Sequence, residues 1–194
     1  MSCRAGRSGV GALLLSMDGV RALFLDRDGV VNCCPGDGYV RTPGEFRFMP
    51  GIFPLMCWAA AQGWKLVLVT NQQGVGKGIM SAGDLDAIHR KMQSDLAREA
   101  VPFDAVYACT HLAGTCDCRK PSPVMIARAC REHGISADRS VLIGDADRDI
   151  AMARNAGVGV AMRLLGGRVE EEAADVRVRS LGEALDWLRG REWP

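Results

Sequence analysis

The stretch that decides the fold is A-L-F-L-D-R-D-G-V-V-N, residues 22–32. Its first four residues are all apolar, which is typical of a strand buried on both faces of a sheet. Asp26 and Asp28 follow where that strand ends, and Gly29 allows the chain to turn sharply after them. The sequence therefore predicts a buried strand with two carboxylates at its carboxyl end.

Short apolar runs of the same kind recur along the chain and predict further strands. They are L-V-L-V (66–69), F-D-A-V-Y-A (103–108), V-L-I (141–143) and V-G-V-A-M (158–162). Stretches with helical features lie between and after them, at 51–62, 81–99, 121–133, 147–156 and 180–190. This alternation predicts an α/β fold with a Rossmann-like parallel sheet flanked by helices. We expect one domain over residues 21–194, after a disordered extension at residues 1–20.

Polar groups follow three of the predicted strands. T-N-Q-Q-G (70–74) and G-D-A-D-R-D (144–149) should meet Asp26 and Asp28 at one sheet edge, because ligands bind beyond the carboxyl ends of parallel strands. Close carboxylates repel each other, and Mg²⁺ would offset that repulsion with Asp145 as a further ligand. Asp26 could then attack phosphorus and form an aspartyl-phosphate, while Asp28 transfers protons.

Two further residues suit a transferring phosphoryl group. The hydroxyl of Thr70 can donate to a phosphoryl oxygen, together with backbone N–H groups of the following turn. Lys120 can neutralise the charge that spreads over the transferring group. Neither residue is informative alone, since threonine is common in strands and most lysines are solvated. Phosphoryl chemistry is predicted from the set of residues, not from any single one.

A second cluster lies in C-T-H-L-A-G-T-C-D-C-R-K-P, residues 109–121. Its candidate metal ligands are Cys109, His111, Cys116 and Cys118. Three thiolates and one imidazole predict a closed tetrahedral Zn²⁺ site, which is structural because no position is left for water. The alternative is a loop of reduced surface cysteines. We expect Zn²⁺ to fix the loop that carries Arg119 and Lys120, since metal binding and folding are coupled.

Taken together, the motifs resemble those of the haloacid dehalogenase superfamily of Mg²⁺-dependent phosphotransferases. They occur in that family's order: D-R-D-G-V (26–30), T-N (70–71), Lys120 and G-D-A-D-R-D (144–149). The resemblance implies that Asp26 is the nucleophile and Asp28 the general acid and base. It also implies that Thr70 and Lys120 hold the phosphoryl group.

The same resemblance implies a metal site and a supporting carboxylate. Mg²⁺ would be bound by Asp26, Asp145 and the backbone carbonyl of Asp28. Asp149 would support Lys120 or a water molecule bound to the metal.

The resemblance narrows to one branch of the superfamily. F-L-D-R-D-G-V-V-N (24–32), T-N-Q-x-G (70–74) and C-x-H…C-x-C-R-K-P (109–121) are similar to the histidinol-phosphatase and heptose-bisphosphate phosphatase branch, whose members have little or no cap domain. G-D-G-Y-V-R (36–41) resembles the substrate loop of the heptose enzymes. The resemblance therefore implies hydrolysis of the 7-phosphate of D-glycero-D-manno-heptose 1,7-bisphosphate.

Substrate contacts are also implied by this resemblance. They are Asp37, Gly38, Tyr39, Asn71, Gln72 and Arg119. Ala146 stands where some heptose enzymes carry a lysine that can reach the substrate. The planar guanidinium of Arg119 could hold the distal phosphate instead.

Three other functions remain open. Histidinol-phosphate phosphatases share the chemistry and the short spacing between His111 and Cys116. The run T-N-Q-x-G-x-G-x-G (70–78) also resembles the phosphatase part of polynucleotide kinase-phosphatases, which act on DNA 3′ ends. A non-catalytic zinc module is the third alternative.

Composition bears on these alternatives. The 194 residues carry a net charge of +1, from 24 basic and 23 acidic residues, which gives no reason to expect nucleic acid as a partner. No apolar run approaches the ~20 residues that span a bilayer, and residues 1–20 lack the features of a secretory signal. We expect a cytoplasmic monomer that acts on a small phosphorylated metabolite, a sugar bisphosphate, without a membrane partner.

Overall fold

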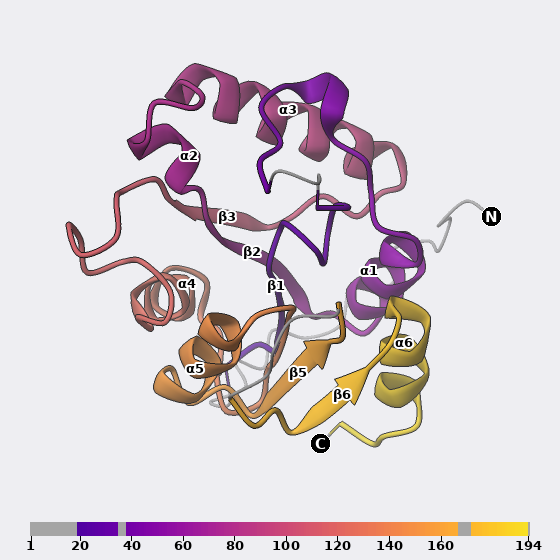
Figure 1. Ribbon diagram of the computed structural model, residues 1–194. Helices are drawn as coiled ribbons and strands as arrows, with labels where there is room; N and C mark the ends of the chain where they lie inside the picture. Colours follow the sequence, from indigo (N-terminus) through magenta and orange to yellow (C-terminus); the bar gives the residue numbers. More distant parts are fainter. Residues whose placement is uncertain (1–18, 35–37, 167–171, 194) are drawn as a thin grey trace.

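A computed structural model describes residues 19–34, 38–166 and 172–193 (Figure 1). Within these residues, six strands form one sheet in the order β3-β2-β1-β4-β5-β6, and all neighbouring strands are parallel. The strands are β1 (Ala22–Leu25), β2 (Lys65–Asn71), β3 (Ala105–Cys109), β4 (Val141–Gly144), β5 (Val160–Leu164) and β6 (Val176–Val178). The predicted parallel sheet is confirmed.

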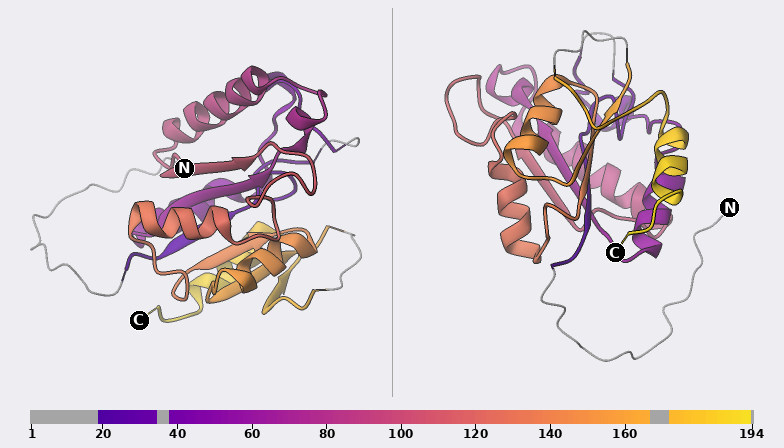
Figure 2. Two further views of the ribbon diagram at one scale, coloured as in Figure 1. Left: turned by 90° about the vertical axis from the view of Figure 1, so that its left-hand side faces the viewer. Right: turned by 90° about the horizontal axis from the view of Figure 1, so that it is seen from below.

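Helices cover both faces of the sheet (Figure 2). One face packs against α1 (Ile52–Ala61), α3 (Ala82–Arg98) and α6 (Leu181–Arg189), and the other against α4 (Val124–His133) and α5 (Asp147–Asn155). Side chains of β1 alternate between the two layers: Leu23 and Leu25 enter the first core, and Phe24 enters the second. All three are fully buried, which explains the unbroken apolar run.

The boundaries of the helices follow local capping. Helix α3 begins after Ser81, whose hydroxyl accepts from the backbone N–H of Asp84 at 3.1 Å, while the Asp84 carboxylate accepts from the backbone N–H of Ser81 at 2.9 Å. Helix α4 ends at Gly134, which has a φ of +63°. It begins three residues later than predicted, because residues 119–122 form a turn closed by the N–H of Ser122 and the carbonyl of Arg119.

Two short elements were not predicted. Helix α2 (Gln73–Gly76) and strand β6 have four and three residues, too few to show a hydrophobic period. Between β1 and α1, the described residues contain only a short 3₁₀ helix, η1 (Pro43–Glu45), as regular structure. The expectation of little or no cap domain agrees with this arrangement.

The first described residues belong to the fold. Val20, which we expected in the extension, bridges to Ile135: its N–H donates to the carbonyl of Gly134 at 2.8 Å, and its carbonyl accepts from Ser136 at 2.9 Å. Residues 1–18 lie outside the described part of the chain. Among the helices that are described, we find none with the length and apolar character needed to cross a membrane.

Candidate functional site

A buried lysine organises the carboxyl edge of the sheet. The Nζ atom of Lys120 lies 2.7 Å from Oδ1 of Asp26, 2.6 Å from Oδ1 of Asp149 and 3.1 Å from the carbonyl oxygen of Val69. The Lys120 side chain has no exposed surface. A buried ammonium is stable only when it is paired and hydrogen bonded, and these three oxygens supply that.

Three carboxylates meet at this edge, and we call them the carboxylate cluster: Asp26, Asp145 and Asp149. One oxygen from each lies within 4.8 Å of the others. Lys120 balances one of the three charges, so a divalent cation would balance the other two. These hard oxygen ligands fit Mg²⁺, which binds through one or two carboxylates and retains several waters.

Burial shapes the ionisation of Asp26, which is only 3% exposed. Burial raises the pKa of Asp26 to about 7, although the nearby Lys120 ammonium acts in the opposite direction. Asp149 and Asp145 contribute further to the increase. A cation at the carboxylate cluster would therefore favour the ionised form of Asp26.

Glycines allow the carboxylates to approach so closely. Gly29 has a φ of +93°, and a Cβ atom there would lie 2.4 Å from Oδ2 of Asp145. A Cβ atom on Gly144 would lie 2.2 Å from Cβ of Asp149. Larger residues would therefore displace the carboxylates, which gives a physical reason for the glycines of D-R-D-G and G-D.

The Asp28 carboxylate receives five hydrogen bonds. Arg27 donates through Nε (3.1 Å to Oδ1) and Nη2 (3.0 Å to each oxygen). Nδ2 of Asn32 donates to Oδ1 at 3.1 Å, and Nε2 of Gln72 donates to Oδ2 at 2.8 Å. Sequence reasoning missed Arg27 and Asn32. The available signal was a charged residue at the end of a buried strand, which needs a partner.

Gln72 connects Asp28 to the end of β2. The same Nε2 atom lies 2.8 Å from Oγ1 of Thr70. Thr70 and Gln72 are both buried. The structure thus brings Asp28, Thr70 and Gln72 together, although they come from two different strand ends.

Asn71 holds the backbone of Lys120. Its Oδ1 atom accepts from the Lys120 N–H at 3.1 Å, and its Nδ2 atom donates to the Lys120 carbonyl at 3.3 Å. Asn71, which we predicted as a substrate contact, thus places the backbone of the catalytic lysine candidate through its amide. Next to it, Nη2 of Arg119 donates to Oε1 of Gln73 at 3.2 Å.

The described part of the predicted substrate loop lies beside α2. Tyr39 accepts a hydrogen bond at its hydroxyl from Nζ of Lys77 at 3.2 Å. A Cβ atom on Gly74 would lie 2.9 Å from the Tyr39 ring, so this ring packs directly on α2. Gly38 is exposed with a φ of +84°, whereas Asp37 is outside the described residues.

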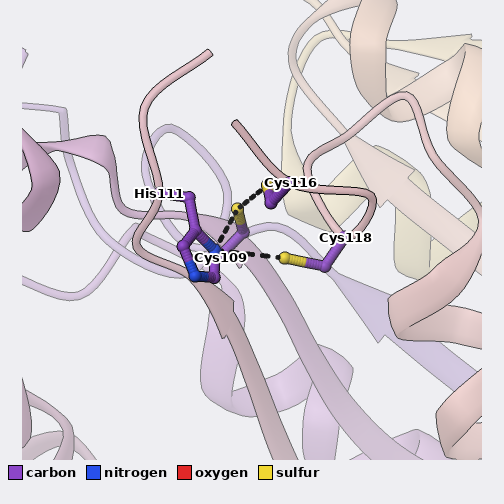
Figure 3. A group of neighbouring side chains, drawn as sticks. All are labelled: Cys109, His111, Cys116 and Cys118. Atoms are coloured by element: carbon purple, nitrogen blue, oxygen red, sulfur yellow. Dashed lines mark hydrogen bonds between the residues drawn. The ribbon is translucent and has the colours of Figure 1, made fainter. Parts of the chain in front are cut away.

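The second cluster occupies the loop between β3 and α4, residues 109–118, which we call the cysteine loop (Figure 3). Sγ of Cys109 lies 3.5 Å from Sγ of Cys116 and 3.8 Å from Nδ1 of His111, and Sγ of Cys118 lies 3.5 Å from the same nitrogen. Zn–S bonds of ~2.3 Å and Zn–N bonds of ~2.0 Å at tetrahedral angles put such atoms about 3.5–3.8 Å apart. The four side chains therefore fit a tetrahedral Zn²⁺ ion.

Two of the three thiols, those of Cys109 and Cys118, are held in the protonated form, whereas at Cys116 burial is outweighed by hydrogen bonds, which lower the pKa of that thiol. Burial, and then hydrogen bonds with Cys109 and Cys116, raise the pKa of Cys118 to about 12. Burial also raises the pKa of Cys109. Since thiolates are the metal-binding form, ion binding and loss of thiol protons would be coupled in this loop.

The cysteine loop is joined to the sheet edge by backbone contacts. The N–H of Gln72 donates to the carbonyl of Cys109 at 2.7 Å, and the N–H of Gly76 donates to the carbonyl of Thr110 at 3.0 Å. A Cβ atom on Gly76 would lie 2.7 Å from that Thr110 oxygen. The loop thus begins against β2 and α2 and returns to the site at Lys120.

Known proteins with similar sequences are named as heptose-bisphosphate 7-phosphatases, and their names differ in the anomer of the heptose, alpha or beta. A D-glycero-beta-D-manno-heptose-1,7-bisphosphate 7-phosphatase of Helicobacter pylori is 35% identical over 87% of this chain and 97% of its own length. A D-glycero-alpha-D-manno-heptose-1,7-bisphosphate 7-phosphatase of Mycobacterium bovis is 39% identical over 83% of this chain and 87% of its own. The chain belongs to the heptose-bisphosphate phosphatase branch of the haloacid dehalogenase superfamily.

Other comparisons agree with this membership. Residues 117–183 of the phosphatase match the family model described as HAD-hydrolase-like. A crystal structure of a D,D-heptose 1,7-bisphosphate phosphatase from B. bronchiseptica, complexed with magnesium and phosphate, is similar with a TM-score of 0.77 and 30% identity. The similarity covers 88% of this chain and 99% of that chain. The chain is thus a phosphoric monoester hydrolase of the sugar phosphatase kind.

Proposed function

We propose that this phosphatase hydrolyses the 7-phosphate of D-glycero-D-manno-heptose 1,7-bisphosphate through an aspartyl-phosphate on Asp26. The observation that carries the proposal is the contact of buried Lys120 with Asp26 and Asp149, beside Asp145. This arrangement provides a nucleophile, a fixed positive charge and oxygen ligands for a cation. The names of the similar proteins support the choice of sugar.

In the first half-reaction, the Asp26 carboxylate attacks phosphorus and the bond from phosphorus to the sugar oxygen breaks. Asp28 gives a proton to that sugar oxygen. The hydroxyl of Thr70 and the ammonium of Lys120 hold the phosphoryl oxygens, and Asp149 keeps Lys120 oriented. Mg²⁺, held by Asp26, Asp145 and the carbonyl of Asp28, would neutralise charge on the phosphoryl group and the carboxylates.

In the second half-reaction, Asp28 takes a proton from water, which attacks the phosphorus of the aspartyl-phosphate. The acyl phosphate bond breaks, inorganic phosphate leaves and the Asp26 carboxylate is restored. Both half-reactions require Asp28 to lie close to one position, which is occupied first by the leaving sugar oxygen and then by the oxygen of the attacking water. Its contact with Gln72, which also touches Thr70, supports that placement.

The cysteine loop has a structural role in this proposal. Zn²⁺ bound by its four ligand side chains would fix the segment that leads to Arg119 and Lys120. Substrate recognition is assigned to Arg119, Asn71, Gln72 and the loop of Asp37, Gly38 and Tyr39. Arg119 is the candidate for the distal phosphate, because Ala146 offers no charge. We assign the phosphatase domain to residues 21–194, with Val20 attached to it.

A substrate panel tests the proposal. Phosphate release would be measured with Mg²⁺ and with EDTA on both anomers of the heptose bisphosphate, on histidinol phosphate and on a 3′-phosphorylated oligonucleotide. We expect kcat/KM for one heptose anomer to exceed that for histidinol phosphate about 100-fold or more, because polar groups built for one substrate stay unpaired with another. Asp26→Asn is the inactive control. A preference for histidinol phosphate or the oligonucleotide would overturn the proposed substrate.

A further inference from the structure

One fully buried charged side chain of the site, Arg27, is not used by the reaction above. Arg27 has no exposed surface, although it lies between the two catalytic aspartates of the sequence motif. Its guanidinium contacts the Asp28 carboxylate on one side and His89 of α3 on the other. A buried guanidinium has a large desolvation cost, so its position is set by these partners.

Hydrogen bonds distinguish the two oxygens of Asp28. Oδ1 accepts from Nε and Nη2 of Arg27 and from Nδ2 of Asn32. Oδ2 accepts from Nη2 of Arg27 and from Nε2 of Gln72. A carboxylate oxygen has about two lone-pair positions, and both oxygens have at least two donors. They differ in the Gln72 donor on Oδ2, whose Nε2 atom also lies 2.8 Å from Oγ1 of Thr70 and can turn to it, whereas the donors on Oδ1 come from Arg27 and Asn32. Oδ2 is the oxygen on the side of Gln72 and Thr70, where the phosphoryl group is expected.

His89 fixes the other side of the arginine. Nη1 of Arg27 lies 3.4 Å from Nε2 of His89. Arginine can only donate, so Nε2 accepts and the ring proton lies on Nδ1. Burial, and then the charge of Arg27, lower the pKa of His89 to about 4, which keeps the ring neutral. Helix α3 is anchored through the buried side chains Leu85, Ile88 and Met92, and it therefore supports Arg27 from behind.

We propose that Arg27 is a positioning residue that holds Oδ1 of Asp28, so that Oδ2 exchanges the proton with the leaving sugar oxygen and then with water. Gln72 would give up its contact with Oδ2 when the substrate oxygen arrives. The planar fork of arginine fixes both the place and the rotation of the carboxylate, which a lysine could not do. This inference rests on the proposed function, because it needs Asp28 as the acid.

Dependence on the leaving group provides the test. The parameter kcat/KM reports steps up to departure of the leaving group, so it isolates the proton donation by Asp28. For Arg27→Met we expect kcat/KM on a sugar phosphate to fall about 100-fold, the typical size of general acid catalysis. On p-nitrophenyl phosphate, whose leaving group needs no proton, we expect a loss below about 5-fold. Most of the loss on the sugar phosphate should lie in kcat, with KM little changed.

Two variants separate positioning from a structural role. Arg27→Lys keeps the charge without the fork, and we expect the same selective loss at a smaller size. This variant also serves as the test if Arg27→Met does not fold. Arg163→Met is the matched control, because Arg163 is equally buried at the same edge but contacts the Asp145 carbonyl and the Asp147 carboxylate. Its loss should be similar on both substrates. Equal losses on both substrates for Arg27→Lys, or selectivity for Arg163→Met, would overturn the proposal.

The test remains informative if the proposed substrate is wrong. Glycerol phosphate can replace the sugar phosphate, since only the poor leaving group matters. A wild-type enzyme that hydrolyses glycerol phosphate and p-nitrophenyl phosphate but not heptose bisphosphate would refute the substrate and leave Arg27 testable. A loss that is selective for the poor leaving group would still support the positioning role.

Discussion

The carboxylate cluster and the cysteine loop are both candidate metal sites, but they are held in different ways. The carboxylate cluster is buried at the ends of β1 and β4 and the start of α5, where the sheet places its members. The cysteine loop has one buried ligand, Cys109 at the end of β3, and the others lie on a loop with partial or full exposure.

The two sites also differ in how far their geometry depends on a bound ion. The carboxylate cluster contains its own partial counter-charge in Lys120, so its geometry depends on the ion only in part. The thiols of the cysteine loop must lose protons to bind, so that loop and its ion form together. Lys120 links the two regions, because the cysteine loop leads directly to it. The sheet builds the carboxylate cluster, and under the proposed function the cysteine loop holds the segment that leads to Lys120.

The largest effect should come from the carboxylate cluster. Asp26→Asn removes the nucleophile, and we expect kcat to fall by about 10⁴-fold or more. Phosphate release under saturating heptose bisphosphate checks this. The cysteine loop should keep its Zn²⁺ content, measured by metal analysis. A variant that retained more than about a hundredth of wild-type kcat would contradict covalent catalysis by Asp26.

Lys120→Met tests the residue that both regions share. We expect kcat to fall about 10³-fold, because the charge on the phosphoryl group loses its fixed partner. Without Mg²⁺, the free energy of unfolding should fall by about 3–5 kcal/mol, since buried carboxylates are left unpaired. Added Mg²⁺ should recover part of that stability. Chemical denaturation with and without Mg²⁺ measures it, and equal stability of variant and wild type would be the contrary result.

Gly29→Ala tests how tightly the sheet edge is packed. The new Cβ would meet Oδ2 of Asp145 at 2.4 Å, at a φ of +93°. We expect Mg²⁺ affinity to fall about 100-fold, because displacement of a ligand by an ångström is costly. Titration of phosphatase activity with Mg²⁺ gives this value.

Gly114→Ala is the matched control in the cysteine loop. Gly114 also has a positive φ, +78°, but a Cβ there would meet nothing within 4 Å. This variant should lose only about 1 kcal/mol of stability from the backbone conformation, with Mg²⁺ affinity unchanged. Equal loss of Mg²⁺ affinity in both glycine variants would show that the clash with Asp145 is not the cause.

The smallest effect on turnover should come from the cysteine loop itself. Cys118→Ala removes one Zn²⁺ ligand, and we expect lower thermal stability together with a fall in kcat of about 10-fold, as Lys120 is held less firmly. Mg²⁺ affinity should stay close to normal, because the carboxylate cluster is built by the sheet. Full kcat in a zinc-free variant would show that the loop does not position Lys120.

Much of the site could be predicted because its parts are local in sequence. The spacing of Asp26, Asp28 and Gly29 and of the four cysteine-loop ligands lies within short segments. The parallel sheet then brings strand ends together, so Thr70 and Asp145 were expected near Asp26. Short elements escaped prediction: α2 and β6 contain too few residues for a periodic pattern.

Contacts between distant segments could not be predicted in the same way. Arg27 and His89 are separated by 62 positions, and their contact depends on how α3 packs on the sheet. The contact of the Asn71 amide with the backbone of Lys120 joins positions 49 residues apart, and no pattern in the sequence indicated it. Such pairings follow from the order of strands and the angles of helices, which apolar runs do not encode.

By itself, the sequence determined the alternation of buried strands and helices, the polar groups at the strand ends and the ligand spacing of the cysteine loop. These features are set by the side-chain period of each element and by short loops. Only the tertiary structure decided the strand order, the complete burial of the Lys120 side chain and the support of Asp28 by Arg27. The physical reason is burial: charges far apart in the chain must find partners once packing removes them from water.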